Sequence, residues 1–219
     1  AILATTSVSP SSKEAICGDS FTVTALKEGK QLIALSDGMG VGEEACRESQ
    51  AAIRLLEKLL NSGFEPETVL QTINSVLQLK SNTDMFATLD IILIDLFTAE
   101  VDFIKIGSAP SFIKRGKRVG IVTSSSLPIG IVDNLDIVSE KRLLSPGDIL
   151  ILVSDGVVEV NRQQSGEDWI SNLLSGIDET DPQIIAELIL AGALALCQGI
   201  PRDDMTVMAV KLAVNNGLN

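Results

Sequence analysis

Short runs of apolar residues with polar alternation open this chain and predict a β-hairpin. Phe21–Leu26 and Gln31–Ser36 are two such runs, separated by the turn-forming segment Lys27-Glu28-Gly29-Lys30. Runs of this length joined by a short glycine-containing connection are typical of paired antiparallel strands. Asp19 lies just before the first run, and Asp37 comes directly after the second. Because one strand starts where its partner finishes, we expect these two carboxylates to lie together.

Apolar residues at a spacing of 3.6 predict four helices. The first two follow Asp37 directly, at about 43–60 and from Pro66 to about Leu79, and form a helical pair. Two more are expected at about 167–175 and 182–198. The last has Asp181 as its N-cap and proline at its first position, where a missing N–H costs nothing.

The remaining apolar runs predict strands that come in a block. They are expected at Ile2–Thr6, Met85–Phe97, Val101–Ile106, Ser111–Arg115, Arg118–Val122, Asp136–Leu143, Asp148–Ser154 and Met205–Val214. Links such as Thr98-Ala99-Glu100 can join antiparallel neighbours but are too short for parallel crossovers. The pattern therefore predicts an α+β fold with antiparallel sheets, in one domain that covers residues 1–219.

The composition narrows the class of protein. With 219 residues, 45% of them hydrophobic, the chain can bury a sizeable core, and no apolar run reaches the roughly 18 residues of a membrane span. A net charge of −12 argues against nucleic acid or an anionic membrane surface as a partner. Cys17, Cys46 and Cys197 form no CxxC pair, so we expect small buried side chains in a reducing, intracellular compartment. The chain begins with alanine, which suggests a fragment of a longer protein.

Histidine is absent from the chain, and this absence limits the chemistry. The chain can therefore form no Ser-His-Asp triad, no Cys-His pair and no histidine-ligated zinc site. Acids and bases must come from Asp, Glu, Lys, Cys or bound water. Ligation by oxygen alone selects Mg²⁺ or Mn²⁺, with Ca²⁺ as a further option.

Aspartates at strand ends supply such oxygen ligands. Ser36-Asp37-Gly38 and Ser154-Asp155-Gly156 each close an apolar run, and Asp203-Asp204 precedes the last strand. Each motif alone is compatible with an ordinary turn. Together with Asp19 they predict a carboxylate metal site, because packed aspartates repel one another unless a cation lies between them. Two divalent ions about 3.5–4 Å apart can activate water without histidine, which favours metal-activated hydrolysis of a phosphate ester.

In their order, these motifs resemble those of PPM-type (protein phosphatase 2C-like) metal-dependent Ser/Thr phosphatases. The residues that carry the resemblance are Gly18-Asp19, Ser36-Asp37-Gly38-Met39-Gly40, Ser154-Asp155-Gly156 and Asp203-Asp204-Met205-Thr206. Residues 107–116 and 127–130 are similar to the sporulation branch, the phosphatase domains of the stage II sporulation protein E family. The resemblance covers essentially the whole chain. It implies two antiparallel sheets packed as a sandwich and flanked by pairs of helices.

The resemblance also implies roles for single residues. Asp37 would bridge two Mn²⁺ or Mg²⁺ ions, and the Gly38 carbonyl would ligate the second. Asp155 and Asp203 would hold the first ion, while Asp19 would act through a bound water, so that Asp37 and Asp19 carry the catalysis. Asp204 stands where relatives usually have asparagine, and the choice between Asp203 and Asp204 stays open. Many eukaryotic relatives bind the substrate phosphate with an arginine that precedes the Gly-Asp motif. Here residues 11–17 offer only Lys13, and phosphate binding is expected to rest on the metals.

A biological setting follows from the same resemblance. The expected substrate is a phosphoserine or phosphothreonine on an anti-sigma-factor antagonist in sporulation, and the domain would sit on the cytoplasmic side of a membrane-anchored protein. A homodimer is a further possibility, because surface leucines on the helical pairs could form its contact face. One alternative is a catalytically silent interaction domain that binds a structural Ca²⁺ or Mg²⁺. Another is a Mg²⁺-dependent phosphohydrolase with an aspartyl nucleophile, although Asp37 is followed by Gly38-Met39 and the usual Asp-x-Asp is missing.

Overall fold

The computed structural model describes residues 2–11, 16–40, 42–79, 86–123, 126–160 and 166–214. Its strands form two five-stranded antiparallel sheets. Sheet A consists, in spatial order, of β1 (Ile2–Ser11), β10 (Met205–Val214), β9 (Ile149–Val153), β6 (Ser111–Arg115) and β7 (Arg118–Val122). Sheet B consists of β2 (Asp19–Ala25), β3 (Lys30–Asp37), β4 (Leu89–Asp95), β5 (Glu100–Ile106) and β8 (Ser139–Leu143).

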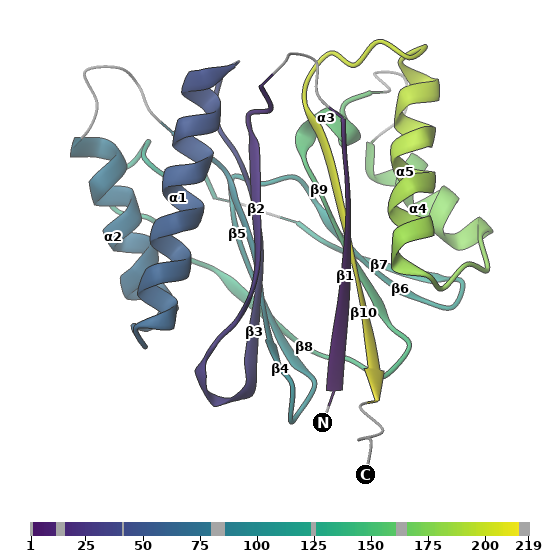
Figure 1. The fold of residues 1–219 in the computed structure, drawn as a ribbon, viewed down its shortest axis with the longest axis horizontal. Helices are drawn as coiled ribbons and strands as arrows, with labels where there is room; N and C mark the ends of the chain where they lie inside the picture. Colours follow the sequence, from purple (N-terminus) through teal and green to yellow (C-terminus); the bar gives the residue numbers. More distant parts are fainter. Residues whose placement is uncertain are drawn as a thin grey trace.

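Helices cover the outer faces of both sheets and complete four layers (Figure 1). The helices are α1 (Glu43–Asn61), α2 (Pro66–Leu79), α3 (Asp155–Val158), α4 (Gly166–Gly176) and α5 (Pro182–Leu196), and a 3₁₀ turn spans Lys27–Gly29. The pair α1 and α2 lies on sheet B, and the pair α4 and α5 lies on sheet A (Figure 1). The predicted α+β sandwich is therefore confirmed.

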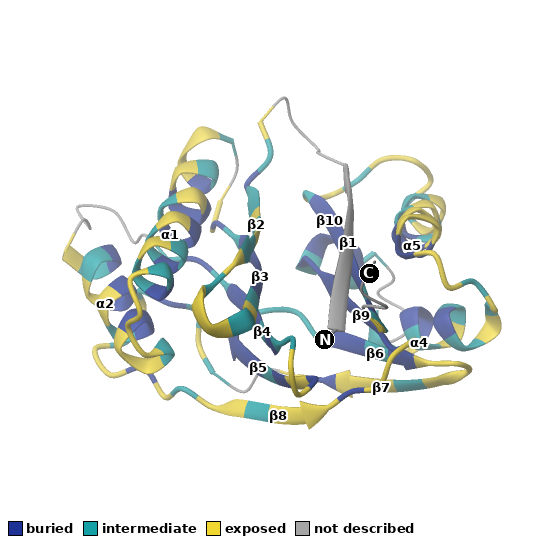
Figure 2. Ribbon diagram, turned by 60° about the horizontal axis from the view of Figure 1, so that its bottom comes forward, coloured by how far each residue is buried: buried dark blue, intermediate teal, exposed yellow. Residues whose placement is uncertain are grey.

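Three buried clusters of apolar residues hold these layers together. One joins α1 and α2 to the outer face of sheet B, and a second joins α4 and α5 to sheet A. The third lies between the sheets and includes Ile33, Phe103 and Leu152. Figure 2 shows the buried residues concentrated in the central strands and on the inward faces of the helices. Burial of these faces is the main stabilising contribution to the fold.

Several element boundaries differ from the sequence-based prediction. Strand β1 runs to Ser11 and not only to Thr6, because it pairs with β10 along its whole length as an edge strand, where Pro10 is tolerated. Strand β4 begins at Leu89, and β8 begins at Ser139. The predicted start at Met85 and the side chain of Lys13 lie outside the described residues. The cysteines are only partly buried, contrary to the prediction, and all three are free.

A buried polar bridge crosses between the sheets close to the ends of β4 and β6. Lys105 and Asp90 are neighbours in sheet B, with Lys105 Nζ 2.7 Å from Asp90 Oδ2. Ser111 of sheet A donates from Oγ to the same carboxylate oxygen at 2.5 Å and accepts from Lys105 Nζ at 2.9 Å. All three side chains are buried. Burial lowers the pKa of Lys105, against the raising effect of the Asp90 charge.

Replacing Lys105 by alanine is expected to lower the free energy of unfolding by about 3–5 kcal/mol, because the Asp90 carboxylate loses its cation in a buried setting. The double variant Lys105→Met with Asp90→Leu should lose less, since it leaves no unpaired buried charge. Equilibrium unfolding in urea measures both variants. A double variant as unstable as Lys105→Ala would contradict this account.

Candidate metal centre

The hairpin of β2 and β3 brings two aspartates together, as the sequence predicts. Asp19 is the first residue of β2, Asp37 is the last residue of β3, and they are direct partners in the register. Thr88 fixes the backbone of Asp37, because the Asp37 N–H donates to Thr88 Oγ1 at 3.1 Å and its carbonyl accepts from the Thr88 N–H at 2.8 Å. The Asp37 side chain therefore projects from a rigid strand end.

Glycine at position 38 lets helix α1 pack directly against this strand end. A Cβ atom at Gly38 would lie 1.9 Å from the carbonyl oxygen of Ala45, in the first turns of α1. Its neighbour Gly18 forms a contact to the other half of the molecule, since the Gly18 N–H donates to Asp204 Oδ2 at 2.5 Å. A Cβ at Gly18 would lie 3.3 Å from Asp204 Oδ2 and 3.8 Å from the Gly38 carbonyl oxygen, so both oxygens lie close to Gly18.

The second pair of aspartates comes from sheet A. Strands β9 and β10 are antiparallel neighbours, so the residues after β9 meet the residues before β10. Asp155 opens α3, and Asp203 and Asp204 precede β10. Ser154 joins these segments, because its N–H donates to the Thr206 carbonyl at 3.0 Å and its Oγ accepts from the Thr206 N–H at 2.8 Å. Short helix α3 was not predicted, since its four residues are too few to give a period.

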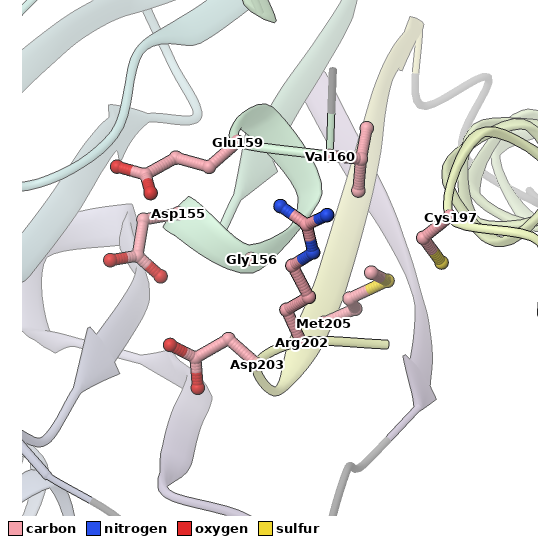
Figure 3. A pocket seen from close by; sticks show the side chains of 8 residues that line it. All are labelled: Asp155, Gly156, Glu159, Val160, Cys197, Arg202, Asp203 and Met205. Carbon is pink, nitrogen blue, oxygen red and sulfur yellow. The ribbon is translucent and has the colours of Figure 1, made fainter. Parts of the chain in front are cut away.

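The two pairs face each other at the edge of the sandwich. Asp37 of sheet B and Asp155 of sheet A line one cavity of about 20 Å³, together with Thr88, Asp90 and Ser108. A cavity of this size has room for about one water molecule. Asp155 and Asp203 line a second cavity of about 110 Å³, where their carboxylates point to the same side (Figure 3). The structure thus brings Asp19, Asp37, Asp155 and Asp203 to one region.

Burial and mutual repulsion make this region unfavourable for negative charge. Burial first, and then the charges of Asp155, Asp19 and Asp203, raise the pKa of Asp37 to about 9. Burial likewise raises the pKa of Asp19 to about 6, against the lowering effect of the nearby Thr206 and Ser154 hydroxyls. The pKa of Asp155 is raised as well, chiefly by burial. Bringing these carboxylates together without a cation therefore costs free energy, either as uncompensated charge or as protons held above their ordinary pKa values.

Unpartnered oxygen atoms give the region its capacity for a cation. Both side-chain oxygens of Asp19, and Oδ1 of Asp155, are buried without a hydrogen-bond partner. In the described part of the chain, no three acidic or cysteine side chains form a ready-made metal-binding group. Mg²⁺ in proteins usually takes one or two carboxylates and keeps several waters, so it does not require such a group. The oxygen donors present fit Mg²⁺ or Mn²⁺.

The raised pKa values predict how stability depends on pH. The folded protein keeps a proton on Asp37 up to about pH 9, whereas the unfolded chain releases it near the ordinary value of 3.8. Without metal, the free energy of unfolding should therefore fall as the pH rises through this window, because the unfolded state binds fewer protons. Saturating Mg²⁺ should reduce the fall, since the cation takes the place of the protons. Thermal unfolding across the window, in chelator and in Mg²⁺, measures both slopes, and equal slopes would contradict the prediction.

The geometry distinguishes the two adjacent aspartates before β10. The Asp204 carboxylate accepts a hydrogen bond from the Gly18 N–H. Asp203 instead lines the larger cavity with Asp155, and its Oδ1 accepts the Asp204 N–H at 2.9 Å. Sequence reasoning did not identify Glu159 and Arg202, which line the same cavity. The sequence marks these two residues only by their positions relative to the predicted ligands. Glu159 follows Asp155 by one helical turn, and Arg202 directly precedes Asp203.

Comparison with known proteins agrees with this architecture. Residues 27–213 match the stage II sporulation protein E (SpoIIE) family. Stage II sporulation protein E from Priestia megaterium is 40% identical over 201 residues, which are 91% of this chain and 34% of that protein. The chain thus spans about a third of the length of this relative.

Solved structures show the same fold. The PP2C phosphatase domain of SpoIIE from Bacillus subtilis, solved with a fragment of its regulatory domain, matches with a TM-score of 0.92 at 38% identity, over 99% of this chain and 64% of that chain. RsbX in complex with magnesium shares the fold with a TM-score of 0.73 at 20% identity, over 96% of each chain. The chain therefore belongs to the stage II sporulation protein E family of PP2C-type serine/threonine phosphatases.

Proposed function

We propose that this domain hydrolyses phosphoserine or phosphothreonine on a protein, with Mn²⁺ or Mg²⁺ as its cofactor. The observation that carries the proposal is the meeting of four aspartates from two sheets, with the Asp19 oxygens unpartnered and the pKa of Asp37 raised to about 9. A protein keeps such an arrangement at a cost in stability, which cations offset. The magnesium bound to RsbX, a protein of the same fold, supports this choice of ion.

The proposed ligands divide between the two sheets. Asp37 and the Gly38 carbonyl would contribute from sheet B, while Asp155 and Asp203 would contribute from sheet A. Asp19 would act through a water, and its buried, unpartnered oxygens are available for this role. Two ions bound here would supply Lewis acidity that activates a water and offsets the negative charge of the phosphoryl group. Thr88 and Ser154 hold the backbone of this site in place.

The expected protein substrate is an anti-sigma-factor antagonist that carries the phosphorylated residue. Membership of the SpoIIE family supports this proposal. The family resemblance also suggests that residues 1–219 act as one phosphatase domain on the cytoplasmic side of a membrane-anchored protein. That the domain forms a homodimer stays a prediction. In the described part of the chain, no helix combines the length and apolarity of a membrane span.

Phosphate release from a phosphoserine protein tests the proposed function. Wild type should release phosphate in Mn²⁺ or Mg²⁺ and lose this activity in chelator. Asp203→Asn should lose the activity too, whereas the matched variant Asp204→Asn should retain more of it, because its proposed role is a hydrogen bond to Gly18. A folded wild type that binds metal but releases no phosphate, with the antagonist among the substrates, would favour the silent interaction domain.

A further inference from the structure

The cavity of about 110 Å³ beside Asp155 has two chemically different sides. Asp155, Asp203 and Glu159 form its acidic side, which it shares with the proposed metal centre. Its apolar side is lined by Val160, Cys197 and Met205. The Arg202 side chain lies between the two sides, and its guanidinium group is directed along α3 (Figure 3).

Arg202 forms no ion pair with a described residue, a property that it shares with Arg54 and Arg118. Arg115, Arg47 and Arg142 each form an ion pair with a nearby carboxylate. Within the described residues, none of the carboxylates forms an ion pair with Arg202, although three acidic side chains line its cavity. An exposed guanidinium at the mouth of a cavity is therefore available to an anion from outside the chain.

Arg202 is adjacent in the sequence to Asp203, one of the proposed metal ligands. Arg202 directly precedes Asp203, so their Cα atoms are about 3.8 Å apart. A phosphate that contacts cations at Asp155 and Asp203 would also come within reach of the Arg202 side chain. A guanidinium group presents paired N–H donors that match the oxygens of a phosphate, and it remains charged at every relevant pH.

We propose that Arg202 binds the phosphate oxygens of the substrate, and that this cavity receives the phosphorylated side chain. The inference rests on the proposed phosphatase function and names its phosphate-binding residue. It changes the expectation from the sequence, in which phosphate binding rested on the metals because residues 11–17 offer only a lysine. The basic residue is instead supplied by the segment before β10.

Variants at position 202 test the proposal by binding as well as by turnover. Arg202→Ala should weaken the binding of inorganic phosphate to the Mg²⁺-loaded protein by about 10- to 100-fold, which is the usual effect of losing a hydrogen bond to a charged group. Calorimetric titration with inorganic phosphate measures this. The KM for a phosphoserine peptide should rise, and Arg202→Lys should recover part of the loss, because lysine keeps the charge but not the paired donors.

Two controls separate substrate binding from other roles. Arg118→Ala removes the same charge from the exposed edge strand β7 and should leave phosphate affinity unchanged. The rise in Tm on adding Mg²⁺ should be preserved in Arg202→Ala, because removing a cation does not weaken a metal site. If this rise is lost, Arg202 supports Asp203 structurally and the proposal is wrong.

The results also distinguish the inference from the proposed function. If wild type hydrolyses the peptide, and Arg202→Ala has an unchanged phosphate affinity and KM, the phosphatase assignment stands and the role of Arg202 is refuted. If wild type has no activity but binds phosphate through Arg202, the proposed function fails while the binding site stands.

Discussion

Replacing Asp37 by asparagine is expected to abolish phosphate release and at the same time to stabilise the metal-free domain. Asp37 is held at the end of β3 among the charges of Asp155, Asp19 and Asp203, and its pKa is raised to about 9. The amide is neutral without a bound proton, so it avoids both the repulsion and the cost of holding that proton at a pH where the unfolded chain has released it. The free energy of unfolding in chelator should therefore rise by about 2 kcal/mol near pH 8, or roughly 4–8 °C in Tm. It also removes the proposed bridging ligand, so turnover should fall by about a thousandfold or more.

Thermal unfolding and phosphate release measure the two effects on one variant. The Mg²⁺-dependent rise in Tm should disappear in Asp37→Asn. Asp136→Asn, which changes an exposed carboxylate on the loop before β8, is a matched control and should alter neither quantity. A variant that keeps both its activity and its response to Mg²⁺ would show that Asp37 is no metal ligand. A less stable metal-free variant would contradict the repulsion argument.

Replacing Gly156 by alanine is expected to destabilise the fold and to separate two proposed ligands. A Cβ atom here would lie 2.1 Å from the carbonyl oxygen of Asp204 and 3.2 Å from Cβ of Asp203. The nearest contact is backbone and cannot turn aside as a side chain would, so α3 and the segment before β10 must move apart. We expect a loss of about 3 kcal/mol or more in the free energy of unfolding. The Mg²⁺ concentration required for half of the Tm rise should increase, because Asp155 and Asp203 no longer face one cavity.

Gly176 provides the matched control for this substitution. It is the last residue of α4, and a Cβ there would meet nothing within 4 Å. Gly176→Ala should therefore be neutral or stabilising by about 0.4–1 kcal/mol, through the reduced freedom of the unfolded chain. Urea unfolding of the two variants separates a local clash from the general effect of adding a methyl group. Equal stability of Gly156→Ala and wild type would mean that α3 does not rest on Asp204.

The local elements and the chemical character of the site could be predicted from the sequence. The hairpin that pairs Asp19 with Asp37 depends only on two apolar runs and a short turn, and the register places them opposite each other. The caps and periods of the long helices predicted α1, α2 and α5 to within about two residues, since these signals come from neighbours along the chain. The absence of histidine restricted the chemistry to oxygen ligands before any coordinates were considered.

Other features required the tertiary structure, because they depend on distances between segments that are remote in the sequence. Strand order placed β9 beside β10, and sheet packing then brought Asp155 towards Asp37. Asp203 and Asp204 are the same residue type in nearly the same sequence context. The hydrogen bond from the Gly18 N–H to Asp204 is what distinguishes them, and it is visible only in the tertiary structure. The free guanidinium of Arg202 likewise follows from the packing of α3 against the segment before β10.

The sequence by itself thus determined the elements, the hairpin and the kinds of ligand, because backbone propensity and side-chain period act over a few residues. Only the tertiary structure decided which carboxylates face one another, how strongly their pKa values rise, and which cation remains free beside them. These properties arise from burial and from charges across the interface of two sheets, and neither is encoded in local spacing.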